Sequence, residues 1–187
     1  LKGTEWLDFF PTPLAGIEIT HRDKVVDPKY VEECTGEVEL TISMLGKLIQ
    51  KPKASVKLLT KPPFRFLHDV FSEVTRTTGF GEGLLDEDEK EAKFMEKDAR
   101  LAYLEKVTSL VNVALKTTVD ATPESLLEGT DFVHTNRLLQ LFAVGATHVP
   151  DSQKAVAKVL KNSSKGAPKN SNNNEALSAS ARNTRAR

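Results

Sequence analysis

Residues 61–84, KPPFRFLHDVFSEVTRTTGFGEGL, contain the clearest helical signal in the chain. Apolar side chains recur there at intervals of three and four residues, as in a helix that buries one side. Two prolines precede the pattern, where a missing amide donor costs a helix nothing, and three glycines follow it, as is usual at a helix end. We therefore expect a buried stripe of Phe66, Leu67, Val70, Phe71 and Val74, and we assign Pro62, Phe66, Leu67 and Gly79 to the fold, with no ligand role.

Similar spacing indicates further helices on both sides of this stretch. No segment between residues 37 and 160 alternates polar and apolar residues over a useful length, so strands are not expected. The sequence predicts an all-α globule of five to seven helices. The other helices are expected at residues 37–50, 55–59, 97–116 and 134–146, with one beginning at the Thr122-Pro123 cap and a last one capped by Asp151 or Ser152.

Three regions are expected along the chain: 1–36, 37–160 and 161–187. Residues 1–36 show no sustained helical period but hold apolar residues such as Trp6 and Phe9. They are either an extended arm that docks on another surface, including that of the domain itself, or a disordered extension. Residues 161–187 hold six basic residues against Glu175 alone, a balance of +5, and almost no apolar residues, which predicts a disordered basic linker.

The composition excludes several kinds of protein. Acidic and basic residues balance at 26 each, so net charge predicts no partner. A single cysteine, Cys34, excludes an internal disulfide or a multi-cysteine zinc site and fits a reducing compartment. No apolar run approaches the roughly 20 residues needed to span a bilayer, and nothing signal-like follows Leu1. We expect no membrane association.

Several patterns superficially suggest chemistry. His68, Asp69 and Glu73 lie close on one helix, but no second ligand cluster lies nearby, so a structural role is favoured over a metal site. Residues 21–23, HRD, lack the other kinase motifs. Residues 79–83, GFGEG, lack the spacing of a phosphate loop and favour a helix stop. Cys34 has no identifiable base. We expect no enzyme activity, no catalytic residue, no metal and no cofactor.

The remaining functional signal is charge. Between residues 47 and 76 there are seven basic residues and two acidic ones, a local balance of +5. Such an uneven segment favours an anionic macromolecular partner, although exposed lysines are often only a solvated face. Nucleic-acid binding is a weaker alternative, which rests only on the basic residues of 161–187, because no basic motif with interleaved aromatic residues is present. The residues expected to bind the partner are Lys47, Lys51, Lys53, Lys57, Lys61 and Arg65.

Several strings in this region match a known family. LLTKPPFRFLHD at residues 58–69, EVTRTTGF at 73–80, and shorter matches at 45–47, 97–99, 135–136 and 138–140 resemble the amino-terminal domain of the intraflagellar transport protein 54 family. The resemblance covers roughly residues 37–160. It implies a calponin-homology-like fold, and it implies binding of tubulin or microtubules by an adaptor of the intraflagellar transport complex B. The expected location is the cilium or flagellum, the basal body and the cytoplasm.

The resemblance also implies other partners. The family pairs with the 20-kilodalton subunit of the complex through a coiled coil that is absent here, so this chain is expected to be an amino-terminal piece. Ciliary motors and other complex subunits are further partners, and docking onto one of them without tubulin contact is the alternative function. This sequence departs from the family in two places. Residues 1–36 match nothing in the family. Where the family has two adjacent basic residues after the first helix, this chain has Gln50-Lys51, which is one basic residue fewer for binding.

Overall fold

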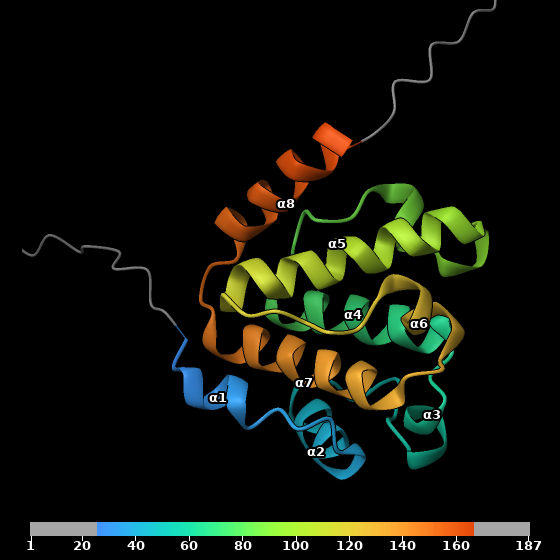
Figure 1. The fold of residues 1–187 in the computed structure, drawn as a ribbon, viewed down its shortest axis with the longest axis vertical. Coiled ribbons are helices and arrows are strands. Elements are labelled where there is room, and N and C mark those ends of the chain that lie inside the picture. The colour runs from blue at the N-terminus through green and yellow to red at the C-terminus, as the bar shows by residue number, and fades with distance from the viewer. Residues whose placement is uncertain (1–25, 167–187) are drawn as a thin grey trace, which may run out of the picture.

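A computed structural model describes residues 26–166, and within them the chain forms α-helices and short 3₁₀ segments without any strand (Figure 1). The predicted all-α fold is confirmed. Seven α-helices, α2 to α8, begin within residues 37–160, in agreement with the five to seven expected there, and an eighth, α1, lies before them in the described range. The elements are α1 Pro28–Glu32, α2 Val38–Leu48, α3 Val56–Thr60, α4 Phe64–Thr78, η1 Glu87–Lys90, η2 Ala92–Phe94, α5 Lys97–Leu115, α6 Pro123–Glu128, α7 Phe132–His148 and α8 Gln153–Gly166.

Helix α4 is the predicted buried helix. The backbone N–H of Gly79 donates to the carbonyl of Thr75 at 2.7 Å and ends the helix in the left-handed conformation, at φ 77°. Glycine adopts this conformation without the steric cost that a side chain adds. All five residues of the predicted stripe are buried: Phe66, Leu67, Val70, Phe71 and Val74.

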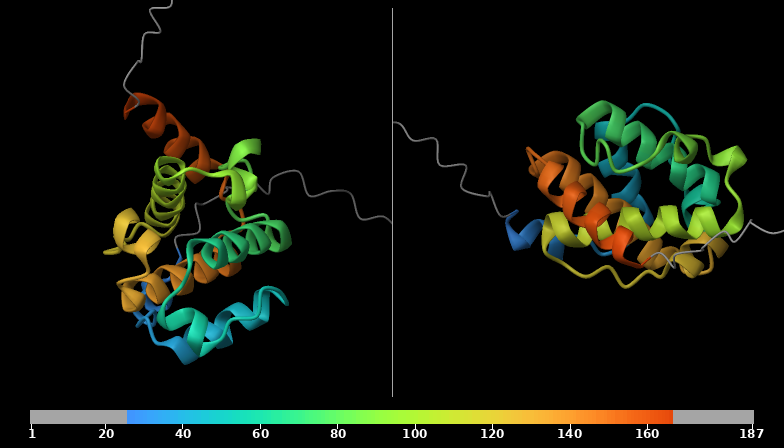
Figure 2. Two further views of the ribbon diagram at one scale, coloured as in Figure 1. Left: turned by 90° about the vertical axis from the view of Figure 1, so that its right-hand side faces the viewer. Right: turned by 90° about the horizontal axis from the view of Figure 1, so that it is seen from above.

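Helix α7 lies at the centre of the assembly and packs against α1, α2, α3, α4 and α5 (Figures 1 and 2). It begins at Phe132, two residues before its expected start, because the Asp131 carboxylate accepts from the backbone N–H of His134 at 3.2 Å and caps the first turn. The Phe142 ring meets the rings of Phe71 and Phe80 edge-on, at 4.8 and 5.1 Å between centroids. These aromatic contacts join α4, α7 and the loop after α4 into one core.

The two ends of the described range differ from the expected arm and linker. Val26 and Cys34 are buried in the core, and the Tyr30 ring stacks on His148 of α7 at 4.0 Å between centroids. Residues 26–36, the described part of the expected arm, thus dock on the domain itself and include the short helix α1. At the other end α8 continues to Gly166, beyond its expected end at residue 160. The remaining residues of the arm and linker, 1–25 and 167–187, lie outside the described residues.

Two helical glycines allow a matched test of the packing. A Cβ added at Gly145 in α7 would lie 2.5 Å from Cζ of Phe80, whereas a Cβ at Gly46 in α2 would have no atom within 4 Å. We expect Gly145→Ala to destabilise the fold by about 1–3 kcal/mol through overpacking. Gly46→Ala should stabilise it by about 0.5–1 kcal/mol through helix propensity. Urea unfolding measures both, and equal effects of the two substitutions would contradict the packing of Phe80 on α7.

Candidate functional site

The six basic residues expected to bind a partner form what we call the basic run. Lys47 lies in the last turn of α2, Lys57 in α3, and Arg65 in the first turn of α4. Lys51 and Lys53 lie in the connection between α2 and α3, and Lys61 follows the last residue of α3. All six residues are exposed. The basic run therefore follows the surface from the end of α2 through α3 to the start of α4.

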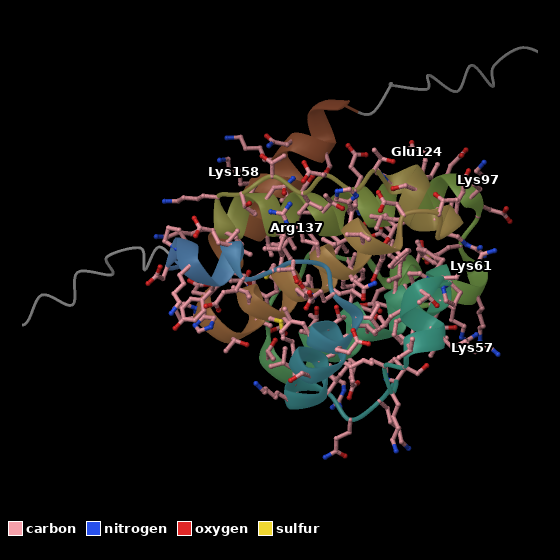
Figure 3. All side chains as sticks on the ribbon, turned by 60° about the horizontal axis from the view of Figure 1, so that its bottom comes forward. Lys57, Lys61, Lys97, Glu124, Arg137 and Lys158 are labelled. Atoms are coloured by element: carbon pink, nitrogen blue, oxygen red, sulfur yellow. The ribbon has the colours of Figure 1, made fainter. Side chains whose placement is uncertain are left out.

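Figure 3 labels two residues of the basic run, Lys57 and Lys61. They are four residues apart at α3, and both side chains extend outward from the same side of the molecule. The Ser55 hydroxyl accepts from the backbone N–H of Leu58 at 3.4 Å and caps this short helix. The cap orients α3 so that Leu59 is buried while both lysines remain in solvent.

Ion pairs affect only one end of the basic run. Arg65 Nε lies 3.8 Å from Asp69, and both side chains are well exposed, so this pair offsets little of the charge. Arg76, further along α4, is different because its Nε and a terminal nitrogen donate to Glu73 at 2.9 and 2.6 Å. The hydrogen bond from Arg76 lowers the pKa of the Glu73 carboxyl, so this pair remains charged and mutually neutralised. Arg76 is therefore not part of the basic run.

Two buried polar residues of α7 hold the elements that carry the basic run. Asn136 Nδ2 donates to the carbonyls of Leu59 in α3 and of Phe132, at 2.8 and 2.7 Å. Gln140 Oε1 accepts from the backbone N–H of Gly36 at 2.9 Å, and its Nε2 donates to the Glu37 carbonyl, also at 2.9 Å. Sequence reasoning did not identify this role. The available signal was the presence of two amides, Asn136 and Gln140, four residues apart and next to the apolar residues of α7.

Replacing Gln140 by methionine tests this anchor. Methionine keeps the side-chain volume but leaves the buried backbone N–H of Gly36 without an acceptor, and it removes the donor to the Thr41 hydroxyl at 2.9 Å. We expect a loss of about 2–4 kcal/mol in the free energy of unfolding, because an unsatisfied buried donor costs its full desolvation. Chemical denaturation measures the loss. A change below about 0.5 kcal/mol would show that the amide is not anchoring the start of α2.

His68 has the structural role that its position in α4 predicted. It is buried, its ring stacks on Tyr103 at 5.0 Å between centroids, and Nε2 donates to the Glu89 carbonyl at 2.8 Å. Beside it lies an open hollow of about 190 Å³. Among the described residues no group of three or more His, Cys, Asp or Glu side chains is arranged to hold a metal ion. The hollow is lined by Arg65, His68, Asp69, Lys90, Glu91, Ala92 and Lys93.

Two other sequence patterns had superficially suggested chemistry: the glycine-rich residues 79–83 and the HRD string at residues 21–23. The glycine-rich loop at residues 79–83 follows the end of α4, and the backbone N–H of Gly81 donates to the Ser152 hydroxyl at 2.9 Å. The loop therefore holds the start of α8, as a structural connection. The HRD string at residues 21–23 lies outside the described residues. No helix within residues 26–166 is long and apolar enough to cross a membrane.

Cys34 is buried just after the end of α1, and its Sγ donates to the carbonyl of Tyr30 at 3.3 Å. Burial raises the pKa of its thiol from 9.0 to about 11. The thiolate is the reactive form, so we expect iodoacetamide to alkylate Cys34 at pH 8 roughly 100-fold more slowly than an unperturbed thiol. Mass spectrometry of the native and urea-unfolded chain measures this ratio. Equal rates in both states would contradict the burial of residues 26–36.

The helices of the described residues and the family match below define a small all-helical domain with a calponin-homology-like fold. Residues 37–148 match the family described as the microtubule-binding protein MIP-T3 CH-like domain, and the chain belongs to that family. It is 43% identical over 121 residues to TRAF3-interacting protein 1 of Danio rerio, covering 64% of this chain and 19% of the relative. The Mus musculus protein of the same name is 39% identical over 124 residues, 66% of this chain and 20% of the relative. The alignment thus spans about a fifth of the length of these relatives.

Proposed function

We propose that this chain is a non-enzymatic adaptor domain that binds tubulin or microtubules through the basic run. The observation that carries the proposal is an exposed segment of six basic residues in which no Asp or Glu occurs between residues 40 and 68. The family description names microtubule binding, and tubulin offers a strongly acidic surface. Opposite charges on the two surfaces accelerate encounter and orient the complex.

The expected strength follows from the exposure of these side chains. An exposed ion pair contributes about 0.2–1 kcal/mol, so no single lysine dominates. Several such contacts, together with the polar and apolar surface around them, suffice for micromolar affinity, which corresponds to about 8 kcal/mol. Exposed charges are screened over roughly 8–10 Å at physiological ionic strength, so the affinity should fall steeply as salt rises.

The wider assignment rests on the family. We propose that the chain acts within the intraflagellar transport complex B of the cilium or flagellum, also at the basal body and in the cytoplasm. The partner subunits, including the 20-kilodalton subunit and ciliary motors, belong to this proposal because the alignment covers about a fifth of the relatives.

A titration of the fluorescently labelled chain, residues 1–187, with tubulin at 50, 150 and 300 mM salt tests the function. We expect saturable binding that weakens at least about tenfold across this range. Absence of binding at 50 mM salt would contradict the proposal.

Salt-insensitive binding to a transport subunit, without tubulin binding, would instead support the docking alternative. The observation that favours this alternative is a pair of exposed apolar residues at the start of α7, Phe132 and Val133, at 41% and 43% exposure. The amino-terminal arm is tested by deleting residues 1–25. The deletion stops at residue 25 because a deletion of residues 1–36 would also remove Val26 and Cys34, which are buried in the core.

A further inference from the structure

Exposed apolar side chains gather beside one end of the basic run. Among the described residues, the large apolar side chains that are exposed belong to Tyr30, Val56, Phe132, Val133 and Leu160. Val56 precedes Lys57 in α3, and Phe132 and Val133 begin α7. The two helices are in contact and lie next to each other in Figure 1. Single exposed apolar residues are normal, but a cluster of them is typical of an interaction site.

Contacts between α3 and α7 fix these apolar residues beside the lysines. Asn136 Nδ2 donates to the carbonyls of Leu59 and Phe132, so the end of α3 and the first turn of α7 lie side by side. A Cβ added at Gly129, just before α7, would lie 3.6 Å from Cγ of Lys61. The first turn of α7 thus borders the α3 part of the basic run. We call this area the α3–α7 surface; it consists of Val56, Lys57, Lys61, Phe132 and Val133.

The charge of the α3–α7 surface is positive. Asp131 is close by, but its carboxylate accepts from the backbone N–H of His134 at 3.2 Å and pairs with the Nδ1 of the same residue at 2.6 Å. Glu128, the last residue of α6, is exposed and bounds the surface on one side. Within the described part of the chain neither Lys57 nor Lys61 forms an ion pair. An occupant of this surface should therefore combine apolar side chains with carboxylates.

The chain itself contains a segment of this chemistry. Residues 4–10, TEWLDFF, hold Trp6, two phenylalanines and a leucine together with Glu5 and Asp8. Between residues 3 and 20 there are three acidic residues and no lysine or arginine. The aromatic side chains match the apolar part of the α3–α7 surface, and the carboxylates match its lysines.

This segment is long enough to reach the α3–α7 surface. Tyr30 of α1 stacks on His148, the last residue of α7, so the described chain begins near the end of α7 opposite to Phe132. Helix α7 has 17 residues and is about 25 Å long. Residues 11–25 span up to about 50 Å when extended. The linker therefore exceeds the length of α7 by about twofold.

We propose that residues 4–10 bind the α3–α7 surface of their own chain, with the aromatic side chains against its apolar residues and the carboxylates beside its lysines. Tethering by a short linker gives an effective concentration in the millimolar range. An intrinsic dissociation constant of about 1 mM or less therefore suffices for the segment to be bound most of the time.

The bound segment covers Lys57 and Lys61, and it therefore competes with an acidic partner for one end of the basic run. This consequence, unlike the docking itself, rests on the proposed function. If two-thirds of the molecules have the segment bound, the apparent affinity for a fully competing partner falls about threefold. The arm thus acts as an internal competitor of the partner.

Trp6 is the only tryptophan of the chain, so its fluorescence reports on the segment directly. Acrylamide should quench Trp6 at least about threefold less in the folded chain than in the urea-unfolded chain, as expected for an occupancy of two-thirds or more. Phe132→Ala/Val133→Ala and Lys57→Glu/Lys61→Glu should each raise quenching at least about twofold, because each removes one half of the surface. The matched control, Leu160→Ala, removes an exposed apolar side chain of α8 and should leave quenching unchanged.

Circular dichroism checks that the variants are folded, and the wild-type measurement needs no variant at all. Equal quenching of Trp6 in the folded and unfolded chain would overturn the docking. Protection that persists in both α3–α7 variants would assign the segment to another surface and would also overturn it. Protection that develops only as the protein concentration rises would show binding to a second copy of the chain, against the proposal.

Tubulin titrations separate this inference from the proposed function. Trp6→Ser/Phe9→Ser/Phe10→Ser keeps the charge of the arm and should bind tubulin at least about twofold more tightly than wild type. Equal affinities would contradict the competition. If Trp6 is protected but neither chain binds tubulin, the proposed function fails and the docking stands. If both chains bind tubulin and Trp6 is unprotected, the docking fails and the proposed function stands.

Discussion

Replacing Phe142 by alanine is expected to lower the free energy of unfolding by about 3–5 kcal/mol. Phe142 is 2% exposed, and its ring contacts Phe71 of α4 and Phe80 of the following loop. The substitution removes apolar burial and both edge-on ring contacts, and it leaves a cavity where α4 and α7 meet. Because domains of ordinary size are stable by about 5–15 kcal/mol, this loss takes a large part of the stability.

Urea unfolding followed by circular dichroism measures this effect. The matched control is Phe132→Ala in the first turn of the same helix, because Phe132 is 41% exposed. We expect the control to change the free energy of unfolding by less than about 1 kcal/mol. Similar losses for the two phenylalanines would mean that the aromatic core has been placed wrongly.

The helices were predictable from sequence where their signals are local. The stripe of α4 and the glycine at its end depend on neighbours three to five residues away, which a sequence window displays. The start of α6 was equally visible, because the Thr122 hydroxyl accepts from the Ser125 N–H at 3.2 Å and Pro123 occupies the first turn. Helix caps and helical periodicity can therefore be recognised in the sequence without knowledge of the fold.

Other elements depended on distant partners. The α1 segment has only five residues, too few for a period, and Val26 and Cys34 nearby become core residues only once α7 is in place. The Gln140 amide bonds to Gly36, 104 residues away in sequence. No periodicity reveals such a bond, because its geometry exists only after the chain has folded.

For the candidate site, sequence predicted the residue types and little of the geometry. Lysines at helix ends and in connections were expected to be exposed, and all six residues of the basic run are. What sequence could not supply is the role of Asn136, which fixes α3 by donating to Leu59.

The most direct test of the proposed function compares tubulin binding by wild type and by Lys47→Glu/Lys51→Glu/Lys53→Glu/Lys57→Glu. All four side chains are exposed, so the fold should be unaffected. Four attractive contacts become repulsive, and we expect affinity to fall by at least about tenfold, equivalent to about 1.4 kcal/mol.

The control carries the same change in charge at exposed lysines outside the basic run: Lys29→Glu/Lys97→Glu/Lys116→Glu/Lys158→Glu. Its dissociation constant should stay within about threefold of wild type at 150 mM salt, because only long-range attraction is altered. A tubulin titration in which the basic-run variant binds at least tenfold more weakly than this control would support the proposal. Equal dissociation constants for wild type and the basic-run variant would contradict it.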